Sequence, residues 1–192
     1  MKPLQHLDTD RLRLHASDPA LARRVAAHMV RNRAAHAQWN PPLADALFTV
    51  KGQRERLAEA ARAEAAGTQI GWWLCLRDND AEVIGHLRFS QIARGPFCSA
   101  MLGYAIDTVH EGRGLMREAL SAALADVFGP RVALHRVQAN ARPENTRSLR
   151  LLDRLGFVRE GYAKEYLFID GAWRDHVLTA LHAPDWPATR PP

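Results

Sequence analysis

Cysteine is scarce in this chain, which carries only Cys75 and Cys98 among its 192 residues. The two cysteines form no CxxC motif, so the pattern of a dithiol redox centre or a disulfide-rich scaffold is missing. The histidines form no HxH or HExxH pair, and we expect no metal site. We also find no long apolar run and no signal peptide. We therefore expect a reduced, cytoplasmic protein that has no membrane partner.

Positive charge exceeds negative charge in the composition. The chain has 26 Lys and Arg against 21 Asp and Glu, a formal net charge of +5 at pH 7. This balance favours anionic partners such as phosphate cofactors or RNA-rich particles, with no sign of specific DNA recognition. An apolar content of 47% over 192 residues is enough for one domain with its own core. We place that domain at residues 7–185 and a loose C-terminal tail at 186–192.

Hydrophobic periodicity and turn residues predict an alternation of strands and helices. Strands are expected around Leu12 and Leu14 and at residues 70–76, 82–92, 99–107, 134–139, 157–169 and 173–181. Helices are expected at 19–30, at 47–66, from about residue 115 to 128, and at 146–155. Short connections favour an antiparallel meander for residues 70–107, whereas the strand that follows the third helix should pair in parallel. The predicted fold class is α/β (α+β), with a mixed, mostly antiparallel sheet.

The stretch VHEGRGLMREALSAAL places Gly112 and Gly114 directly before a helix with an apolar face. The first turn of a helix presents N–H groups that have no partner within the helix, together with the positive end of the helix dipole. Glycines at such a turn let a phosphate approach the bare backbone. Taken alone, a GxG pair favours a turn that only shapes a loop.

Four ordered stretches of the sequence resemble the GCN5-related N-acetyltransferase (GNAT) superfamily. They are TDRLRLH, LGYAID followed by EGRGLM, NARPENTRSLRLLDRLGF, and EGYAKEYLFIDGAWRDHVLTAL. Together they are similar to the ribosomal-protein-alanine acetyltransferases of the RimJ and RimL type, and the last stretch is most similar to the RimJ group. The resemblance implies a GNAT fold, whose central sheet has about seven strands, is splayed between the fourth and fifth, and is flanked by helices.

The resemblance also implies acetyl-coenzyme A (acetyl-CoA) as co-substrate and assigns residues to it. By this resemblance the pyrophosphate binds to the glycine turn and the helix that follows, namely Gly112, Arg113, Gly114, Leu115 and Arg117. The pantetheine arm binds along the open edge of the preceding strand, namely Leu102, Gly103, Tyr104, Ala105 and Ile106. Val109 departs from the superfamily, which usually has Gln or Arg three residues before the first glycine. A cradle made of backbone amides survives that change.

The segment that begins the last predicted helix has two roles. As local structure, Asn145 is a good N-cap for that helix, a contribution of about 1 kcal/mol. The resemblance places Asn145 and Ser148 beside the pantetheine and the thioester, and makes Asn140 a further cofactor or substrate contact.

The chemistry implied by the resemblance is attack of an amine on a thioester, which needs a base, an oxyanion contact and an acid for the leaving thiolate. Our candidate base is Glu165, and Tyr162 is a candidate acid or substrate contact, because both alternate with core positions of a strand that would face the cofactor. Ser148 is the alternative acid. RimL-like sequences carry their glutamate nearer to Leu167, and an ordinary solvated strand residue remains the other interpretation of Glu165. Neither cysteine has a paired histidine, so we expect direct attack in a ternary complex.

The resemblance points to the N-terminal alanine α-amine of a ribosomal protein, or of the ribosome, as acceptor. Two other functions stay open at this point: acetylation of a small amine such as a polyamine or an aminoglycoside, and a non-catalytic module that binds CoA or RNA. The loops expected to cover the site are residues 35–48 and the Asp170-Gly171 turn. The sequence is compatible with a monomer or a homodimer.

Overall fold

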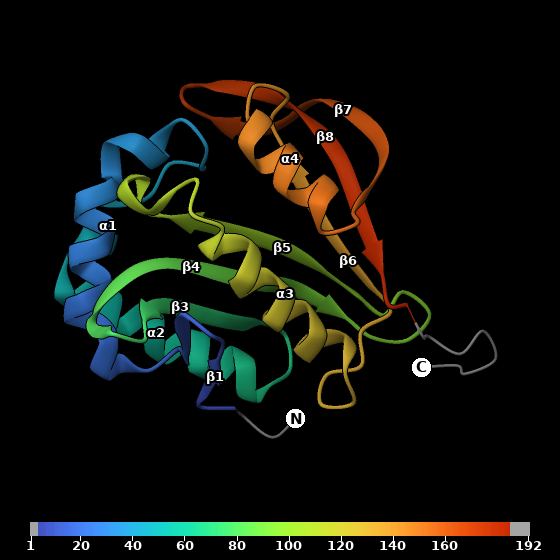
Figure 1. Cartoon of the computed structure of the whole chain (residues 1–192). Helices are drawn as coiled ribbons and strands as arrows, with labels where there is room; N and C mark the ends of the chain where they lie inside the picture. The colour runs from blue at the N-terminus through green and yellow to red at the C-terminus, as the bar shows by residue number, and fades with distance from the viewer. Residues whose placement is uncertain (1–3, 185–192) are drawn as a thin grey trace.

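The computed structural model describes residues 4–184, so the predicted tail at 186–192 lies outside the described residues. An eight-stranded sheet, in the order β1-β2-β3-β4-β5-β6-β8-β7, carries four α-helices (Figure 1). The strands are β1 (His6–Asp8), β2 (Leu12–Ala16), β3 (Ile70–Leu76), β4 (Asn79–Ala93), β5 (Ser99–Ile106), β6 (Arg136–Ala141), β7 (Val158–Ile169) and β8 (Ala172–His182). The helices are α1 (Ala22–Ala37), α2 (Val50–Ala65), α3 (Leu115–Phe128) and α4 (Thr146–Arg154). No helix in this described range is long and apolar enough to cross a membrane.

The predicted mixed, mostly antiparallel sheet is confirmed. Only β5 and β6 pair in parallel among the neighbouring strands of the described chain. The sheet has one strand more than expected, because the short β1 forms a hairpin with β2 in which Leu7 pairs with Leu14. Helix α1 also runs beyond its predicted end at residue 30, since the following RNRAAHA stretch contains strong helix formers and no breaker.

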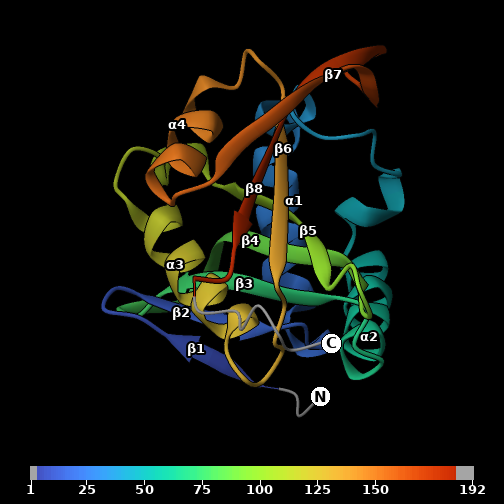
Figure 2. The ribbon, with the colours of Figure 1, turned by 90° about the vertical axis from the view of Figure 1, so that its right-hand side faces the viewer.

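Helices cover both faces of the sheet, with α3 and α4 on one face and α1 and α2 on the other (Figure 2). Strand β3 shows why, because it is apolar on both faces and all of its residues except the half-buried Leu76 are buried. Trp72 and Leu74 belong to the large core cluster that includes α3, and Trp73 and Cys75 belong to a smaller cluster with α1 and α2. The sheet is therefore a central layer with a core on each side.

The parallel pair β5 and β6 separates soon after it forms. Residues 99–101 pair with residues 136–138, and the two strands diverge beyond that point (Figure 1). Residues 102–106 keep their pairing to β4 but have no strand partner on the β6 side within the described range. The predicted splay is thus confirmed, and it gives β5 an open edge in the middle of the sheet.

Candidate active site

The glycine turn before α3 has the geometry of an anion cradle. Gly112 and Gly114 have φ angles of 72° and 77°, in the left-handed region that favours glycine. Gly114 is the N-cap residue of α3, and no side chain of the described residues caps that helix. A Cβ atom at Gly112 would meet no heavy atom within 4 Å, so the space over the turn is open. The first-turn N–H groups of α3 are therefore suited to hold a phosphate group.

The loop between β1 and β2 braces this turn, a contact that the sequence analysis missed. Arg11 donates to the Arg113 carbonyl oxygen at 3.0 Å, and its Nε lies 2.7 Å from Glu118 Oε2. The Thr9 hydroxyl donates to Glu118 Oε1 at 2.6 Å. Burial would raise the pKa of Glu118, but the hydrogen bonds from Thr9 and Arg11 outweigh it and hold that pKa below its usual value. The TDRLRLH stretch thus fixes the start of α3.

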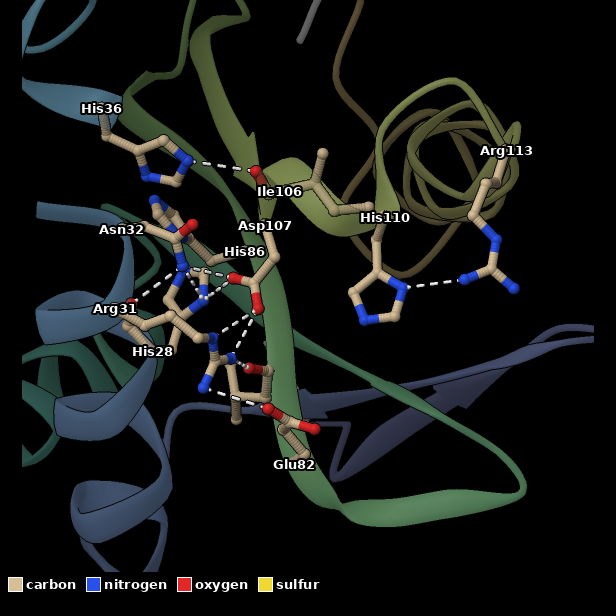
Figure 3. Close-up of polar contacts among 11 residues, drawn as sticks. His28, Arg31, Asn32, His36, Glu82, His86, Ile106, Asp107, His110 and Arg113 are labelled. Carbon is tan, nitrogen blue, oxygen red and sulfur yellow. Dashed lines mark hydrogen bonds and ion pairs between the residues drawn. The ribbon is translucent and has the colours of Figure 1, made fainter. Parts of the chain in front are cut away.

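Basic side chains surround the cradle. Arg113 lies next to His110, with 3.1 Å between Nη1 and Nδ1 (Figure 3). Arg147, in the first turn of α4, forms an ion pair with Glu111, so α4 and the glycine turn are linked across the splay. Arg117 is exposed on α3. These positive charges would add long-range attraction to the backbone contacts of a phosphate.

The start of α4 meets the open edge of β5. The hydroxyl groups of Tyr104 and Ser148 lie 2.7 Å apart. Asn145 accepts a hydrogen bond from the Ser148 backbone N–H at 3.1 Å, which confirms the predicted N-cap. Burial raises the pKa of Tyr104 to about 12, while the hydrogen bond with Ser148 acts in the opposite direction. The phenol therefore keeps its proton at neutral pH and is available as a donor.

Asn140 lies on β6, on the far side of the splay from β5. Its Nδ2 donates to the Tyr166 hydroxyl at 3.1 Å, and the Tyr166 ring lies 5.2 Å from the His176 ring. Asn140 is among the contacts predicted from the sequence, whereas Tyr166 and His176 are not. The signal in the sequence that could have pointed to Tyr166 and His176 is the alternation of polar and aromatic residues in the last two strands.

Tyr162 and Glu165 do not alternate with core positions, and this part of the sequence analysis is wrong. Strand β7 lies at one edge of the sheet, and almost all of its side chains are exposed. A bulge shifts the register between Ala163 and Leu167, and Glu165 has a φ of 48° there. The bulge is held by Asp175, which accepts from the Tyr162 hydroxyl at 2.7 Å and from the Glu165 N–H at 2.8 Å.

A cavity of about 1050 Å³ lies between the sheet and helices α1 and α2. Its lining includes Gly103 and Tyr104 of β5, and the predicted covering loops contribute residues such as Asn40, Asp170 and Gly171. Glu165 and Tyr162 do not line it. The open part of β5 thus has the α3 and α4 side on one face and a large cavity on the other.

A buried polar network fixes the end of β5 from the α1 side (Figure 3). Asp107 is 2% exposed, and it contacts His28 Nδ1 at 2.6 Å, Arg31 Nε at 2.9 Å and the Asn32 amide. Burial opposes ionisation of Asp107, but the hydrogen bonds from His28 and Arg31 outweigh it and lower its pKa. His36 Nε2 lies 3.0 Å from the Ile106 carbonyl oxygen, and burial lowers the pKa of His36.

Comparison with known proteins agrees with this geometry. The acetyltransferase (GNAT) domain family matches residues 2–158. The chain belongs to the GNAT acetyltransferase family. This acetyltransferase is 41% identical over 184 residues to the ribosomal protein uS5 alanine N-acetyltransferase of Escherichia coli (strain K12). The matched region covers 96% of this chain and 94% of the relative.

Two solved structures share the fold over nearly the whole acetyltransferase. The ribosomal-protein-S5-alanine acetyltransferase of Vibrio fischeri has a TM-score of 0.90 and 32% identity, covering 95% of this chain and 98% of that one. Mycobacterium smegmatis RimJ in complex with CoA-disulfide has a TM-score of 0.83 and 29% identity, covering 92% and 84%. The predicted GNAT fold, the similarity to the RimJ and RimL type and the N-acetyltransferase activity are thereby confirmed.

Proposed function

We propose that this protein transfers the acetyl group of acetyl-CoA to the N-terminal α-amine of an alanine in a ribosomal protein. The observation that carries the proposal is the 41% identity to the Escherichia coli enzyme over 96% of the chain. That span includes the glycine turn, the open edge of β5 and the loops at the cavity rim. The net positive charge also favours encounter with an RNA-rich particle.

In this proposal acetyl-CoA and the acceptor amine bind on opposite sides of β5. The amides at Gly112 and Gly114 and the side chains of Arg113 and Arg117 would hold the pyrophosphate of acetyl-CoA. The open edge at residues 102–106 would hold the pantetheine arm, with Asn145 and Ser148 close to the thioester. The CoA-disulfide complex of Mycobacterium smegmatis RimJ supports CoA as the ligand of this fold. The acceptor amine would enter from the cavity on the α1 and α2 side.

Transfer then proceeds by direct attack of the amine nitrogen on the thioester carbonyl. A C–N bond forms, the C–S bond breaks, and the thiolate takes a proton from Ser148. Tyr104 passes its own proton to Ser148 across their 2.7 Å contact, and the proton released by the amine returns to Tyr104 through solvent, so that both hydroxyl groups end the cycle protonated. Glu165 does not line the cavity, so the ammonium proton would reach it through water; we keep it as the candidate base because of its positive φ in the β7 bulge. An α-amine has a pKa of about 8, so its deprotonation at neutral pH is a modest demand on a base.

Mass spectrometry of ribosomal proteins from cells with and without the gene tests the acceptor. We expect one ribosomal protein that starts with alanine to lose its N-terminal acetyl group on deletion. The purified enzyme should release free CoA thiol when it receives acetyl-CoA and an Ala-initiated peptide. Unchanged ribosomal proteins, together with acetylation of a small amine instead of the peptide, would overturn the ribosomal acceptor and leave the acetyltransferase activity intact.

A further inference from the structure

Two arginines of the cavity on the α1 and α2 side have no counter-ion. Arg56 projects from α2 and is half-buried, whereas Arg88 projects from β4 and is exposed to solvent, and both line the cavity. Arg56 Nη1 is buried without a hydrogen-bond partner. Neither guanidinium forms an ion pair with any residue in the range 4–184. A buried N–H donor without a hydrogen-bond partner, such as Arg56 Nη1, costs free energy, and in native structures such a donor calls for an explanation.

The position of these arginines connects them to the reaction. Arg88 is the cross-strand partner of Gly103, on the part of β5 that the splay leaves open. Arg56 lies over the Trp73 ring, with its guanidinium carbon 6.0 Å from the ring centroid. Burial lowers the pKa of Arg56, and the positive charge of Arg88 lowers it further, so the two groups are close enough to repel each other. An anion between them would relieve that repulsion.

The other charged groups of the cavity do not supply that anion. Glu55, Glu59 and Asp170 also line the cavity, and none of them pairs with either arginine. The cofactor phosphates do not supply it, because their cradle lies at the start of α3, on the opposite face of the sheet. The remaining source of an anion for this pair, in a cavity that opens on β5, is the second substrate. Guanidinium groups bind carboxylates in a bidentate geometry, which a polyamine acceptor cannot offer.

We propose that Arg56 and Arg88 form a carboxylate subsite for an acidic side chain close to the N-terminus of the acceptor peptide. The inference rests on the proposed function, since it uses the same cavity and deepens the choice of acceptor. Directly opposed strand residues have Cα atoms about 5 Å apart, and an extended peptide advances about 3.4 Å per residue. The acidic residue should therefore stand roughly two to four positions along the peptide.

Matched peptides test this subsite. Each pair of Ala-initiated peptides differs only by Glu or the isosteric Gln at position two, three or four. We expect the wild-type enzyme to prefer Glu over Gln by about tenfold or more in kcat/KM at one of these positions, mainly through KM. Arg56→Met and Arg88→Met should each remove most of the preference. Arg54→Met, an exposed neighbour on α2, should leave it unchanged.

A charge exchange and a binding measurement make the test independent of folding and turnover. Arg88→Glu should reverse the preference and favour a peptide with Lys at the same position, which a misfolded variant would not do. Calorimetry with the N-acetylated product peptides and CoA should show the same preference of about tenfold for Glu. Equal binding of the Glu and Gln products, or none by either, overturns the subsite. A clear binding preference without acetylation of any peptide supports the subsite and overturns the proposed function.

Discussion

The two faces of the open part of β5 are built on different principles. On the α3 side the contacts for a ligand come from the backbone, at Gly112, Gly114 and the free edge of residues 102–106. On the α1 side the cavity is lined by residues of α1, α2, β3, β4 and β5 and of the loops around them, and its charges are brought together from distant parts of the chain. Backbone geometry suits a substrate that every family member shares, and side-chain chemistry suits an acceptor that varies.

The difference also appears in how each face is held. The glycine turn is braced by exposed or partly buried contacts from Arg11 and Thr9. The α1 face is tied to β5 through Asp107, a fully buried carboxylate with partners on α1. Removing a partner from a buried ion pair leaves an uncompensated charge, whereas surface pairs contribute little. The two faces should therefore respond to mutation by different routes.

The largest effect that we expect is on stability, from Asp107→Asn. The variant removes the carboxylate that His28 and Arg31 share, although Arg31 keeps its ion pair with Glu82, and we expect a loss of about 3 kcal/mol at neutral pH. Because the folded-state pKa of Asp107 is lowered, its stabilisation is fully present above the unfolded-state value and is lost as pH falls through the folded-state pKa. The gap between wild type and variant should stay constant from about pH 7 to 5 and shrink below about pH 4.

Denaturant unfolding across this pH range measures the effect. Asp153→Asn is the matched control, since Asp153 and Arg159 form an exposed ion pair at 3.2 Å. We expect the control to cost less than about 1 kcal/mol. Equal losses in the two variants would mean that the buried network does not hold β5 more firmly than a surface pair would.

The next effect concerns turnover and the strained bulge of β7. Glu165 adopts a positive φ that costs free energy in a non-glycine residue, and such strain is frequent at functional sites. We predict that Glu165→Gln lowers kcat about 100-fold at neutral pH and leaves the affinity for acetyl-CoA unchanged.

Steady-state kinetics and calorimetry measure these two quantities. Lys164→Gln, at the neighbouring exposed position, is the control and should keep its kcat. A Glu165→Gln enzyme with nearly normal kcat would assign the base to water, Tyr162 or the backbone.

Local features of the site were predictable because their rules are local. The glycine turn, the Asn145 cap and the Asp170-Gly171 hairpin each follow from a few adjacent residues, and the structure confirms their geometry. The splay and its position followed from the family resemblance.

Contacts between distant residues were not predictable in this way. The Tyr104 and Ser148 pair spans 44 positions, and the His28 and Asp107 pair spans 79. No periodicity connects such residues before the fold is known. The exposure of β7 was missed for a related reason, because a bulge at Glu165 breaks the two-residue period on which the sequence analysis relied.

A smaller effect should separate cofactor binding from the rest of the cradle. Gly114→Val forces a branched side chain into the left-handed region within the proposed phosphate cradle, where its Cβ would lie 3.5 Å from Arg11 Nη2. We expect the affinity for acetyl-CoA to fall more than tenfold, or by about 1.4 kcal/mol. Calorimetry measures this in the folded variant.

Backbone strain alone has a matched control in this chain. Gly95 has a similar φ of 67° and open space around it, in the turn between β4 and β5. Gly95→Val should therefore carry the same strain and bind acetyl-CoA normally. Equal affinity of the Gly114 and Gly95 variants would contradict the cradle.

The smallest effect is expected at the cysteines, where activity should persist. The sequence shows no histidine paired with Cys75, but the fold brings one close. A ring nitrogen of His15 and a carboxylate oxygen of Asp80 both lie within 4.8 Å of the Cys75 sulfur. His15 Nε2 contacts Asp80 Oδ1 at 2.5 Å, and burial raises the pKa of the Cys75 thiol to about 12. A thiol that holds its proton so firmly is a poor nucleophile. The expectation of direct transfer therefore stands on a different reason.

Cys75→Ala and Cys98→Ala should each keep kcat within about twofold of wild type, because neither sulfur takes part in transfer. Both residues are buried and neither lines the cavity that meets the open edge of β5. Initial-rate kinetics should show the intersecting pattern of a ternary complex. Ping-pong kinetics, with a labelled acetyl group recovered on either cysteine, would show instead that a side chain carries the acetyl group between the two faces of β5.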